Sequence, residues 1–345
     1  MVKAVVVARH GGPEVLEVRE LPDPVAGSGE LLIRVAAAGI NFSDLMARAG
    51  IYPDAPPPPA VLGYEVAGTV VEAGAGVDGF AAGDRVAAGC RFRGQAELVT
   101  ARAADALKLP DTVSFEEAAA IPVNYATAYA ALIIMSGLRR GDRVLIHAAA
   151  GGVGIAAIQI ARNVGAEIFG TASAGKHDAI RAQGVAHAID YRSVDFAEEV
   201  RRLTSGEGVD VIIDATGPTN YRKDYRILRQ GGRLVMFGLA EAHTGDRRNL
   251  RAVASSLVRM PFATMPWWKS AAMMNENRGV FGLNMLHWWE REGSLKRAID
   301  PMVQMLDAGT IRPVVAASFP FSRAADAHRY LQEARNIGKV VLVPD

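Results

Sequence analysis

The 345-residue sequence contains a single cysteine, Cys90, which excludes disulfide bonds within the chain and every structural zinc site built from several cysteines. So little cysteine is typical of a reducing, intracellular compartment, and we expect a cytoplasmic protein. The chain also lacks an excess of charge, because 38 lysine and arginine residues balance 37 aspartate and glutamate residues to a net charge of +1. Proteins that grip nucleic acid generally carry a basic surface, so we expect a small-molecule partner and no nucleic acid.

Long apolar runs are missing as well. The N-terminal "MVKAVVVARHGG" holds only a short apolar run before Arg9 and His10, which is too little for a secretory signal. No uninterrupted apolar segment reaches the roughly 18 residues that span a bilayer, so we expect a soluble protein with no transmembrane segment. Half of the residues are nevertheless apolar and 22% are charged, which is the composition of a folded protein with a large core. The length predicts two domains.

The pattern of the chain changes at about residue 143. Before it, β-rich runs such as "KAVVVA", "ELLIRVAAAGI" and "AGTVVEAG" alternate with proline and glycine clusters, which predicts a compact β-rich domain. After it, strand-like runs alternate with helical ones, which predicts an α/β fold with a doubly wound parallel sheet. The closing "AADAHRYLQEARNIGKVVLVP" reads as a helix and a strand of the first domain. We therefore predict one domain over 1–123 and 315–345, and another over 124–314.

A glycine-rich turn, "HAAAGGVG" at 147–154, lies between the strand "RVLI" and the helical "IAAIQIARNVGA". Ala149, Gly151 and Gly154 form the pattern A-x-G-x-x-G, in which alanine replaces the first glycine of the dinucleotide-binding fingerprint. Such a turn can also exist only for close packing. Its place in the first βαβ unit favours a turn that holds pyrophosphate at the start of a helix. The predicted contacts are Ala150, Gly151, Gly152, Val153 and Gly154.

The second strand, "EIFGTA", decides which nicotinamide cofactor is expected. Its end, up to Ser173, offers no acidic residue for the ribose 2′-hydroxyl of NAD. Lys176 follows within reach of a 2′-phosphate, and Tyr191 is a possible second contact, so the sequence predicts NADP, with Ser173 also at the cofactor. The alternative is that Lys176 is an ordinary solvated lysine.

The run from Gly141 to Arg162, G-D-x-x-L-x-x-x-A-A-G-G-x-G-x-x-x-x-Q-x-x-R, resembles the quinone oxidoreductase signature of the medium-chain dehydrogenase/reductase superfamily. The runs "GINFSDLMARAGIY", "VLGYEVAGTVVEAGAGV" and "IGKVVLVP" are similar to this family too. Within it, "VNYATAY", "FGTASAGKH" and "TGDRRNL" most resemble the vesicle amine transport protein homologue branch. The resemblance implies a GroES-like β-rich domain and a Rossmann domain, with the active site in the cleft between them.

Zinc-dependent members of this superfamily use a cysteine and the histidine of a Gly-His-Glu motif as metal ligands. Here these positions read Asn41 and Tyr64, so we expect no metal. Without a Lewis acid, reducing a quinone or a conjugated enone is easier than oxidising an alcohol. The chain is therefore predicted to be a zinc-independent, NADPH-dependent quinone oxidoreductase or enone reductase that acts on a small apolar carbonyl or quinone.

Three residues of the loop "NFSDLMARAGIY" are predicted to line the acceptor pocket: Asn41, Asp44 and Tyr52. Asn41 and Tyr52 can donate hydrogen bonds to a developing oxyanion, whereas Asp44 orients a neighbour or binds the ribose. The alternative is that "NFSD" caps a helix and that Tyr52 is a packing aromatic.

The resemblance supplies the remaining cofactor candidates, which are Asn124, Thr127, Gly238, Asn336 and Lys339. Asn124 and Thr127 are implied contacts of the nicotinamide, although they can equally be ordinary helix-start residues. Gly238 follows the fifth strand of the Rossmann domain. Lys339 has the alternative interpretation of a charge on an edge strand.

The segment 249–290 fits the family least and contains two tryptophan pairs, in "MPWWKS" and "LHWWERE". Core and interface packing is the favoured interpretation, with a lid or a peripheral membrane contact as alternatives. The run "VFGLNM" predicts a late sheet-edge strand, and because the resemblance to this superfamily implies that such an edge pairs with its twofold mate, we predict a homodimer. Two other functions stay open: an enoyl-thioester reductase, with "GDRRNLR" as its basic contact, and a non-catalytic NADPH-binding protein that acts at membranes or with protein partners.

Overall fold

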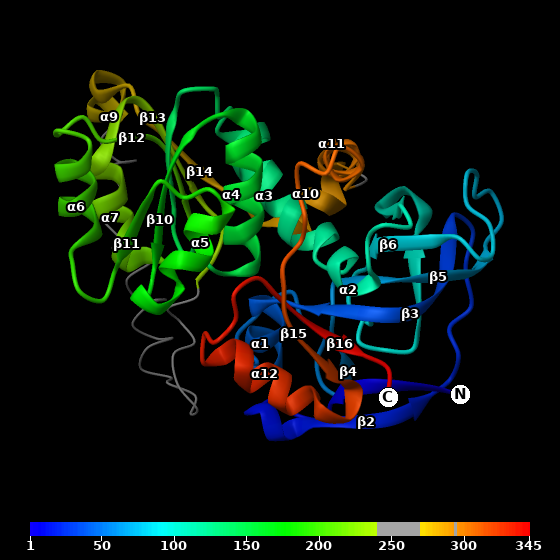
Figure 1. Ribbon diagram of the computed structural model, residues 1–345. Coiled ribbons are helices and arrows are strands. Elements are labelled where there is room, and N and C mark those ends of the chain that lie inside the picture. The colour runs from blue at the N-terminus through cyan, green and yellow to red at the C-terminus, as the bar shows by residue number, and fades with distance from the viewer. Residues whose placement is uncertain (240–269, 293–294) are drawn as a thin grey trace. The chain divides into compact units, whose positions relative to one another are not determined.

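The computed structural model describes residues 1–239, 270–292 and 295–345, which form two compact units (Figure 1). Among these residues, unit 1 comprises 1–126 and 289–345, and unit 2 comprises 127–239 and 270–288. The chain returns to unit 1 earlier than the predicted residue 315. The reason is that α11 (Lys296–Asp307) packs against η3 (Ile121–Tyr125) and β8 (Ala106–Lys108), all within unit 1.

Unit 1 is built on two sheets of mainly antiparallel strands. The larger has the order β15-β16-β3-β5-β6-β8, with β7 also pairing with β3, and the smaller has the order β2-β1-β4. The closing strand β16 pairs antiparallel with β3, so both ends of the chain contribute to the larger sheet. The strands are β1 (Val2–Val7), β2 (Leu16–Leu21), β3 (Glu30–Ile40), β4 (Ala60–Val61), β5 (Glu65–Ala73), β6 (Arg85–Gly89), β7 (Leu98–Arg102), β8, β15 (Val315–Pro320) and β16 (Lys339–Val343).

Apolar side chains of these strands and of two helices form the core of unit 1. Ile33, Val66 and Val86 are fully buried on neighbouring strands, and Phe321 closes the core near α12. Burying apolar surface stabilises a fold by about 25 cal/mol per Å², so this core makes the main stabilising contribution to unit 1. The helices are α1 (Phe42–Ala49), α2 (Phe115–Ala118), α11 and α12 (Ala324–Gln332), and the division of the chain into units falls within α10 (Met285–Glu292), after Trp288.

Unit 2 contains a six-stranded, fully parallel sheet of order β11-β10-β9-β12-β13-β14, which confirms the predicted doubly wound α/β fold. The strands are β9 (Arg143–Ile146), β10 (Glu167–Ala172), β11 (His187–Asp190), β12 (Val209–Asp214), β13 (Leu228–Met236) and β14 (Gly279–Gly282). Helices flank the sheet in Figure 1: α3 (Ala126–Tyr129), α4 (Gly152–Val164), α5 (His177–Gln183), α6 (Phe196–Leu203), α7 (Pro218–Ile227) and α9 (Ser270–Glu276). The strand order runs outward in both directions from β9 and β12, which is the switch point where such sheets bind ligands.

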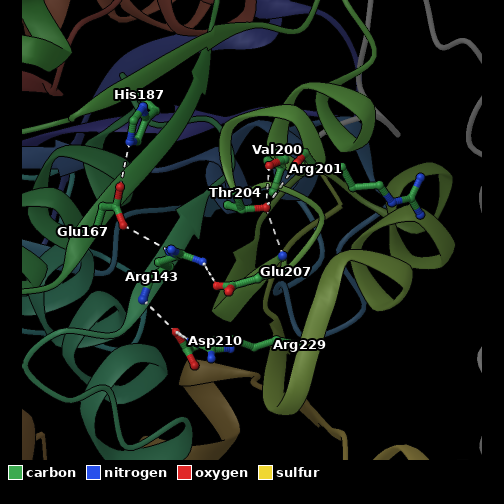
Figure 2. A network of polar contacts seen from close by, with 10 residues as sticks. Arg143, Glu167, His187, Val200, Arg201, Thr204, Glu207, Asp210 and Arg229 are labelled. Carbon is green, nitrogen blue, oxygen red and sulfur yellow. Dashed lines mark hydrogen bonds and ion pairs between the residues drawn. The ribbon is translucent and has the colours of Figure 1, made fainter.

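A polar network ties together the amino ends of four strands of this sheet (Figure 2). Arg143 donates to Glu167 (3.1 Å) and Glu207 (2.6 Å), and its backbone N–H donates to Asp210 (2.8 Å). His187 Nε2 lies 2.8 Å from Glu167. Glu167 is therefore bound within this network at the amino edge of the sheet. Ligands of such sheets bind at the opposite, carboxyl edge.

The segment 249–290 carried predictions for an edge strand and for two tryptophan pairs. β14 ends the order of the described sheet, as predicted for "VFGLNM", while the homodimer itself stays a prediction. Trp289 is buried and packs near Gly89, as expected for a core residue, whereas the first tryptophan pair and "GDRRNLR" lie outside the described residues.

The helical segment Phe115–Met135 is long and apolar enough to cross a membrane, but 72% of its most apolar window is buried, as in a core helix.

Candidate functional site

The glycine-rich turn follows β9 at the carboxyl edge of the unit 2 sheet. Ala148 adopts a left-handed conformation (φ +50°), and its carbonyl accepts the N–H of Gly151 at 2.9 Å. Ala149 donates its N–H to the carbonyl of Thr171 at the end of β10 (3.0 Å). The chain thus reverses within a few residues, and α4 begins at Gly152 next to the end of the strand.

Gly154 is required by a close approach of backbone. A Cβ at this position would lie 2.4 Å from the carbonyl oxygen of Ala148 and 2.6 Å from that of Ala149. At Gly151 the nearest atom to a Cβ would be 3.2 Å away, so that position is less constrained. Gly151 is the N-cap of α4 and offers no side chain to the free N–H groups of the first turn. A helix start that is open in this way fits the pyrophosphate of a dinucleotide.

The predicted ribose contacts lie at the ends of the neighbouring strands. Ser173 directly follows β10, Lys176 is half-buried, and Tyr191 is exposed just after β11. The pKa of Lys176 is lowered, first by burial and then by the positive charge of Arg192. Arg192, whose guanidinium carbon lies 5.8 Å from the Tyr191 ring centroid, was not predicted. Its signal in the sequence was a basic residue two positions after the third strand.

The other predicted cofactor residues fall in both units. Asn124 in unit 1 and Thr127 in unit 2 are both buried. In unit 2, a Cβ at Gly238 would lie 2.5 Å from the carbonyl oxygen of Ala215, so the loops after β12 and β13 meet there. Asn336 in unit 1 is buried and donates to the carbonyl of Gly338 at 2.8 Å.

Asn41 and Asp44 form the start of α1 in unit 1. The Asn41 backbone N–H donates to the Asp44 carboxylate (2.8 Å), as the capping alternative predicted, but the Asn41 side chain turns elsewhere. Its Nδ2 donates to Glu65 Oε1 (2.8 Å), and its Oδ1 accepts from Lys339 Nζ (2.7 Å). The amide is therefore fixed by two charged partners.

Glu65 and Lys339 form a buried ion pair that sequence reasoning missed. Both side chains are at most 2% exposed, and Lys339 Nζ donates to Glu65 Oε1. Glu65 Oε2 accepts the backbone N–H of Val123 at 2.7 Å. The alternative interpretation of Lys339 as an exposed edge-strand charge is therefore wrong, because β16 lies between β15 and β3. The acidic residue in the apolar run "GYEVAG" was the signal, since buried carboxylates need partners.

Aromatic rings surround the predicted acceptor residues of unit 1. Tyr52 lies edge-on to Tyr64 with ring centroids 6.4 Å apart, and Tyr64 lies 4.9 Å from Phe92. Burial raises the pKa of Tyr52 to about 12 and also raises that of Tyr64, so both phenols keep their protons at neutral pH. Asp44 accepts the Gly63 N–H (3.0 Å), and burial raises its pKa to about 7. The structure thus groups two predicted residues, Asp44 and Tyr52, around a tyrosine that was not predicted to take part.

Asn41 and Tyr64 occupy the two positions where zinc-dependent members of the superfamily have their cysteine and histidine ligands, and neither is a usual zinc ligand. Cys90 is buried beside the Gly63 carbonyl (3.7 Å), and burial raises the pKa of its thiol, so it is a poor nucleophile. In the part of the chain that the structure describes, one cluster, His147 with Asp214 and Asp224, brings a nitrogen and two carboxylate oxygens within 4.8 Å of one another. A hydrogen bond joins two of these groups, and we assign no metal ion to the cluster.

Two family models match this chain. One, described as an alcohol dehydrogenase GroES-like domain, covers residues 27–111, and the other, described as a zinc-binding dehydrogenase, covers residues 183–342. Together with the parallel sheet and its glycine turn, these matches define an oxidoreductase fold of the medium-chain dehydrogenase/reductase class. The chain belongs to this superfamily, and its relatives include the synaptic vesicle membrane protein VAT-1 homologs. The VAT-1 homolog of Rattus norvegicus is 38% identical over 350 residues, which is 99% of this chain and 84% of that protein.

Solved structures place the chain near quinone oxidoreductases. The quinone oxidoreductase of Pseudomonas syringae pv. Tomato DC3000 is 31% identical, with a TM-score of 0.83 and full coverage (100%) of both chains. Mycobacterial Rv1454c, solved in complex with NADPH, is 32% identical, with a TM-score of 0.83 and the same coverage of 100%. The predicted resemblance to zinc-independent quinone oxidoreductases is thereby confirmed.

Proposed function

We propose that this oxidoreductase is an NADPH-dependent, zinc-independent reductase of quinones or α,β-unsaturated carbonyl compounds. One observation carries the proposal: Lys176 and Arg192 bring two positive charges to the strand ends beside the glycine turn, and β10 ends without an acidic residue. An acid at that place would select the 2′-hydroxyl of NAD, whereas two cations suit a 2′-phosphate. The NADPH complex of the mycobacterial relative supports the same choice.

The chemistry needs little from the protein beyond position and hydrogen bonds. A bound dihydronicotinamide supplies the hydride. Tyr52 stays protonated at neutral pH, so its phenol can donate a hydrogen bond to the acceptor oxygen as negative charge develops there. Asn41 carries a second Nδ2 hydrogen besides the one donated to Glu65, and this hydrogen can serve the same oxygen. The rings of Tyr52, Tyr64 and Phe92 give the surroundings an apolar, planar character that suits a quinone or an enone.

The test is the loss of reduced-nicotinamide absorbance when the purified protein receives NADPH or NADH with a panel of quinones and enones. We expect turnover with NADPH. Lys176→Ala and Arg192→Ala should each raise the KM for NADPH by roughly 10- to 100-fold, since a hydrogen bond to a charged group contributes about 1.5–3 kcal/mol. The KM for NADH should change little. Arg181→Ala, on α5 and paired with the exposed Asp178 at 3.4 Å, is the matched control for loss of a positive charge.

Other outcomes point to the alternatives. An equal rise in the KM for NADPH and for NADH in the Lys176 and Arg192 variants would show that these cations do not bind the 2′-phosphate. Tight NADPH binding without turnover would favour a non-catalytic NADPH-binding protein. Turnover confined to enoyl thioesters would make the protein an enoyl-thioester reductase.

A further inference from the structure

A buried polar cluster lies directly behind the glycine turn of unit 2. His147, the residue before Ala148, is buried, with Nδ1 3.0 Å from Thr171 Oγ1 and Nε2 2.8 Å from Asp224 Oδ1. Asp224 belongs to α7 and Asp214 ends β12, and neither side chain has any exposed surface. Three elements thus bring one imidazole and two carboxyl groups together away from water.

Among the described residues, the hydrogen bonds of this cluster satisfy only one oxygen of each carboxyl group. Asp214 Oδ1 accepts both the N–H (2.5 Å) and the hydroxyl of Thr216, and Asp224 Oδ1 is bonded to His147. The second oxygens, Asp214 Oδ2 and Asp224 Oδ2, have no hydrogen-bond partner among the described residues. Two buried carboxylates this close repel each other and cannot both stay ionised at low cost. One proton shared between the two carboxyl groups removes this repulsion and supplies the missing hydrogen bond.

The charges that act on the cluster come from its own members. Burial raises the pKa of Asp224 to about 7, His147 lowers it, and Asp214 raises it further. The pKa of His147 is raised by Asp224 and Asp214 against the effect of burial. Lys223, the residue before Asp224 on α7, is bonded to Asp195 (2.6 Å). From β10 and α6 the cluster meets the uncharged Thr171 and Phe196, the latter edge-on to the His147 ring at 4.7 Å.

The cluster is joined to the turn through backbone and side chain. Thr171 contacts the His147 ring with its hydroxyl and accepts the N–H of Ala149 with its carbonyl (3.0 Å). His147 donates its own N–H to the carbonyl of Ile213, next to Asp214 (3.1 Å). A change in the charge of the cluster therefore acts on the residues that shape the turn.

We propose that His147, Asp214 and Asp224 hold one shared proton behind the glycine turn and thereby position this turn for a dinucleotide. The proposal rests on the proposed function only in taking a dinucleotide as the ligand. When the proton leaves, the cluster gains a negative charge behind the site of an anionic pyrophosphate, so affinity falls as pH rises. By linkage, binding of the dinucleotide takes up a proton. The three side chains are positioning residues, since they act through the turn.

The test is calorimetric titration of the full chain with NADH, from pH 6 to 8.5, in buffers of small and of large ionisation enthalpy. NADH is the probe because it lacks the 2′-phosphate, which titrates near pH 6 and would mimic the effect. We expect net proton uptake near neutral pH and an affinity that falls roughly threefold to tenfold over this range.

Asp224→Asn should remove the pH dependence while keeping affinity near the low-pH value, because its amide N–H can donate to Asp214 Oδ2 in place of the proton. Asp214→Asn is the reciprocal variant and should behave alike if the first folds poorly. Asp300→Asn, which removes an exposed carboxylate paired with Lys296 in unit 1, is the matched control and should retain the wild-type profile.

Two results would overturn the proposal: binding of NADH without proton uptake, or an unchanged pH profile in both cluster variants. Because turnover and the choice between NADPH and NADH are measured separately with the Lys176 variant, a failure here leaves the proposed function standing. Absence of all dinucleotide binding would overturn both.

Discussion

Removing the ammonium group of Lys339 is expected to destabilise unit 1 strongly. The Glu65 carboxylate accepts from Lys339 Nζ, Asn41 Nδ2 and the Val123 N–H, in a place where its side chain has no exposed surface. Lys339→Met keeps the volume of the stem but leaves this carboxylate without a counter-charge. Breaking a buried pair from one side costs about 3–5 kcal/mol, because the other charge stays buried and uncompensated.

The assay is urea unfolding at neutral pH followed by circular dichroism, with Lys339→Met, Glu65→Gln and the double variant in one cycle. The double variant should recover about 2 kcal/mol or more relative to the sum of the single losses, since no unpaired charge remains. Lys108→Met removes a lysine from an exposed pair with Asp84 and should cost about 0–1 kcal/mol. A loss at Lys339 as small as that at Lys108 would refute the reasoning.

Two further predictions follow from distances and burial. Gly154→Ala should weaken dinucleotide binding by roughly tenfold or more, measured by calorimetry, because its Cβ would meet the Ala148 carbonyl oxygen at 2.4 Å. Gly282→Ala, where a Cβ would have no atom within 4 Å, should leave affinity unchanged, and equal affinities of the two variants would contradict the account. The pKa values of Asp44 and Asp224 are raised from 3.8 to about 7, so their contribution to stability is fully present below pH 3.8 and is lost as pH rises through 7. The free energy of unfolding should therefore fall between pH 5 and 8, by up to about 3 kcal/mol per group, and a flat or rising profile would count against it.

The features that the sequence predicted well are local ones. The turn at 147–154, the parallel strands around it and the start of α1 at Asn41 all follow from residues that are neighbours along the chain. A glycine pattern reports backbone approach directly, because only the absence of a Cβ permits it. Gly154, the last position of that pattern, is a place where a Cβ would meet the carbonyl oxygens of Ala148 and Ala149.

The features that the sequence did not predict are pairings between distant residues. Lys339 and Glu65 are 274 positions apart, and they meet because β16 and β5 both pair with β3. His147 and Asp224 are 77 positions apart, and they meet through the packing of α7 against the sheet. Such contacts depend on strand register and helix rotation, which hydrophobic periodicity leaves open.

The ion pair of unit 1 also decides which end of the Asn41 amide stays available for a further hydrogen bond. An amide can present either its oxygen or its nitrogen, and the two ends are distinguished by the partners they meet. Lys339 can only donate, so it faces Oδ1, and the Glu65 carboxylate can only accept, so it faces Nδ2. With the oxygen engaged by the ammonium group, Asn41 is left with an N–H, which is a donor, for any further partner. The ion pair thereby fixes Asn41 in the orientation that the proposed hydrogen bond to an acceptor oxygen requires.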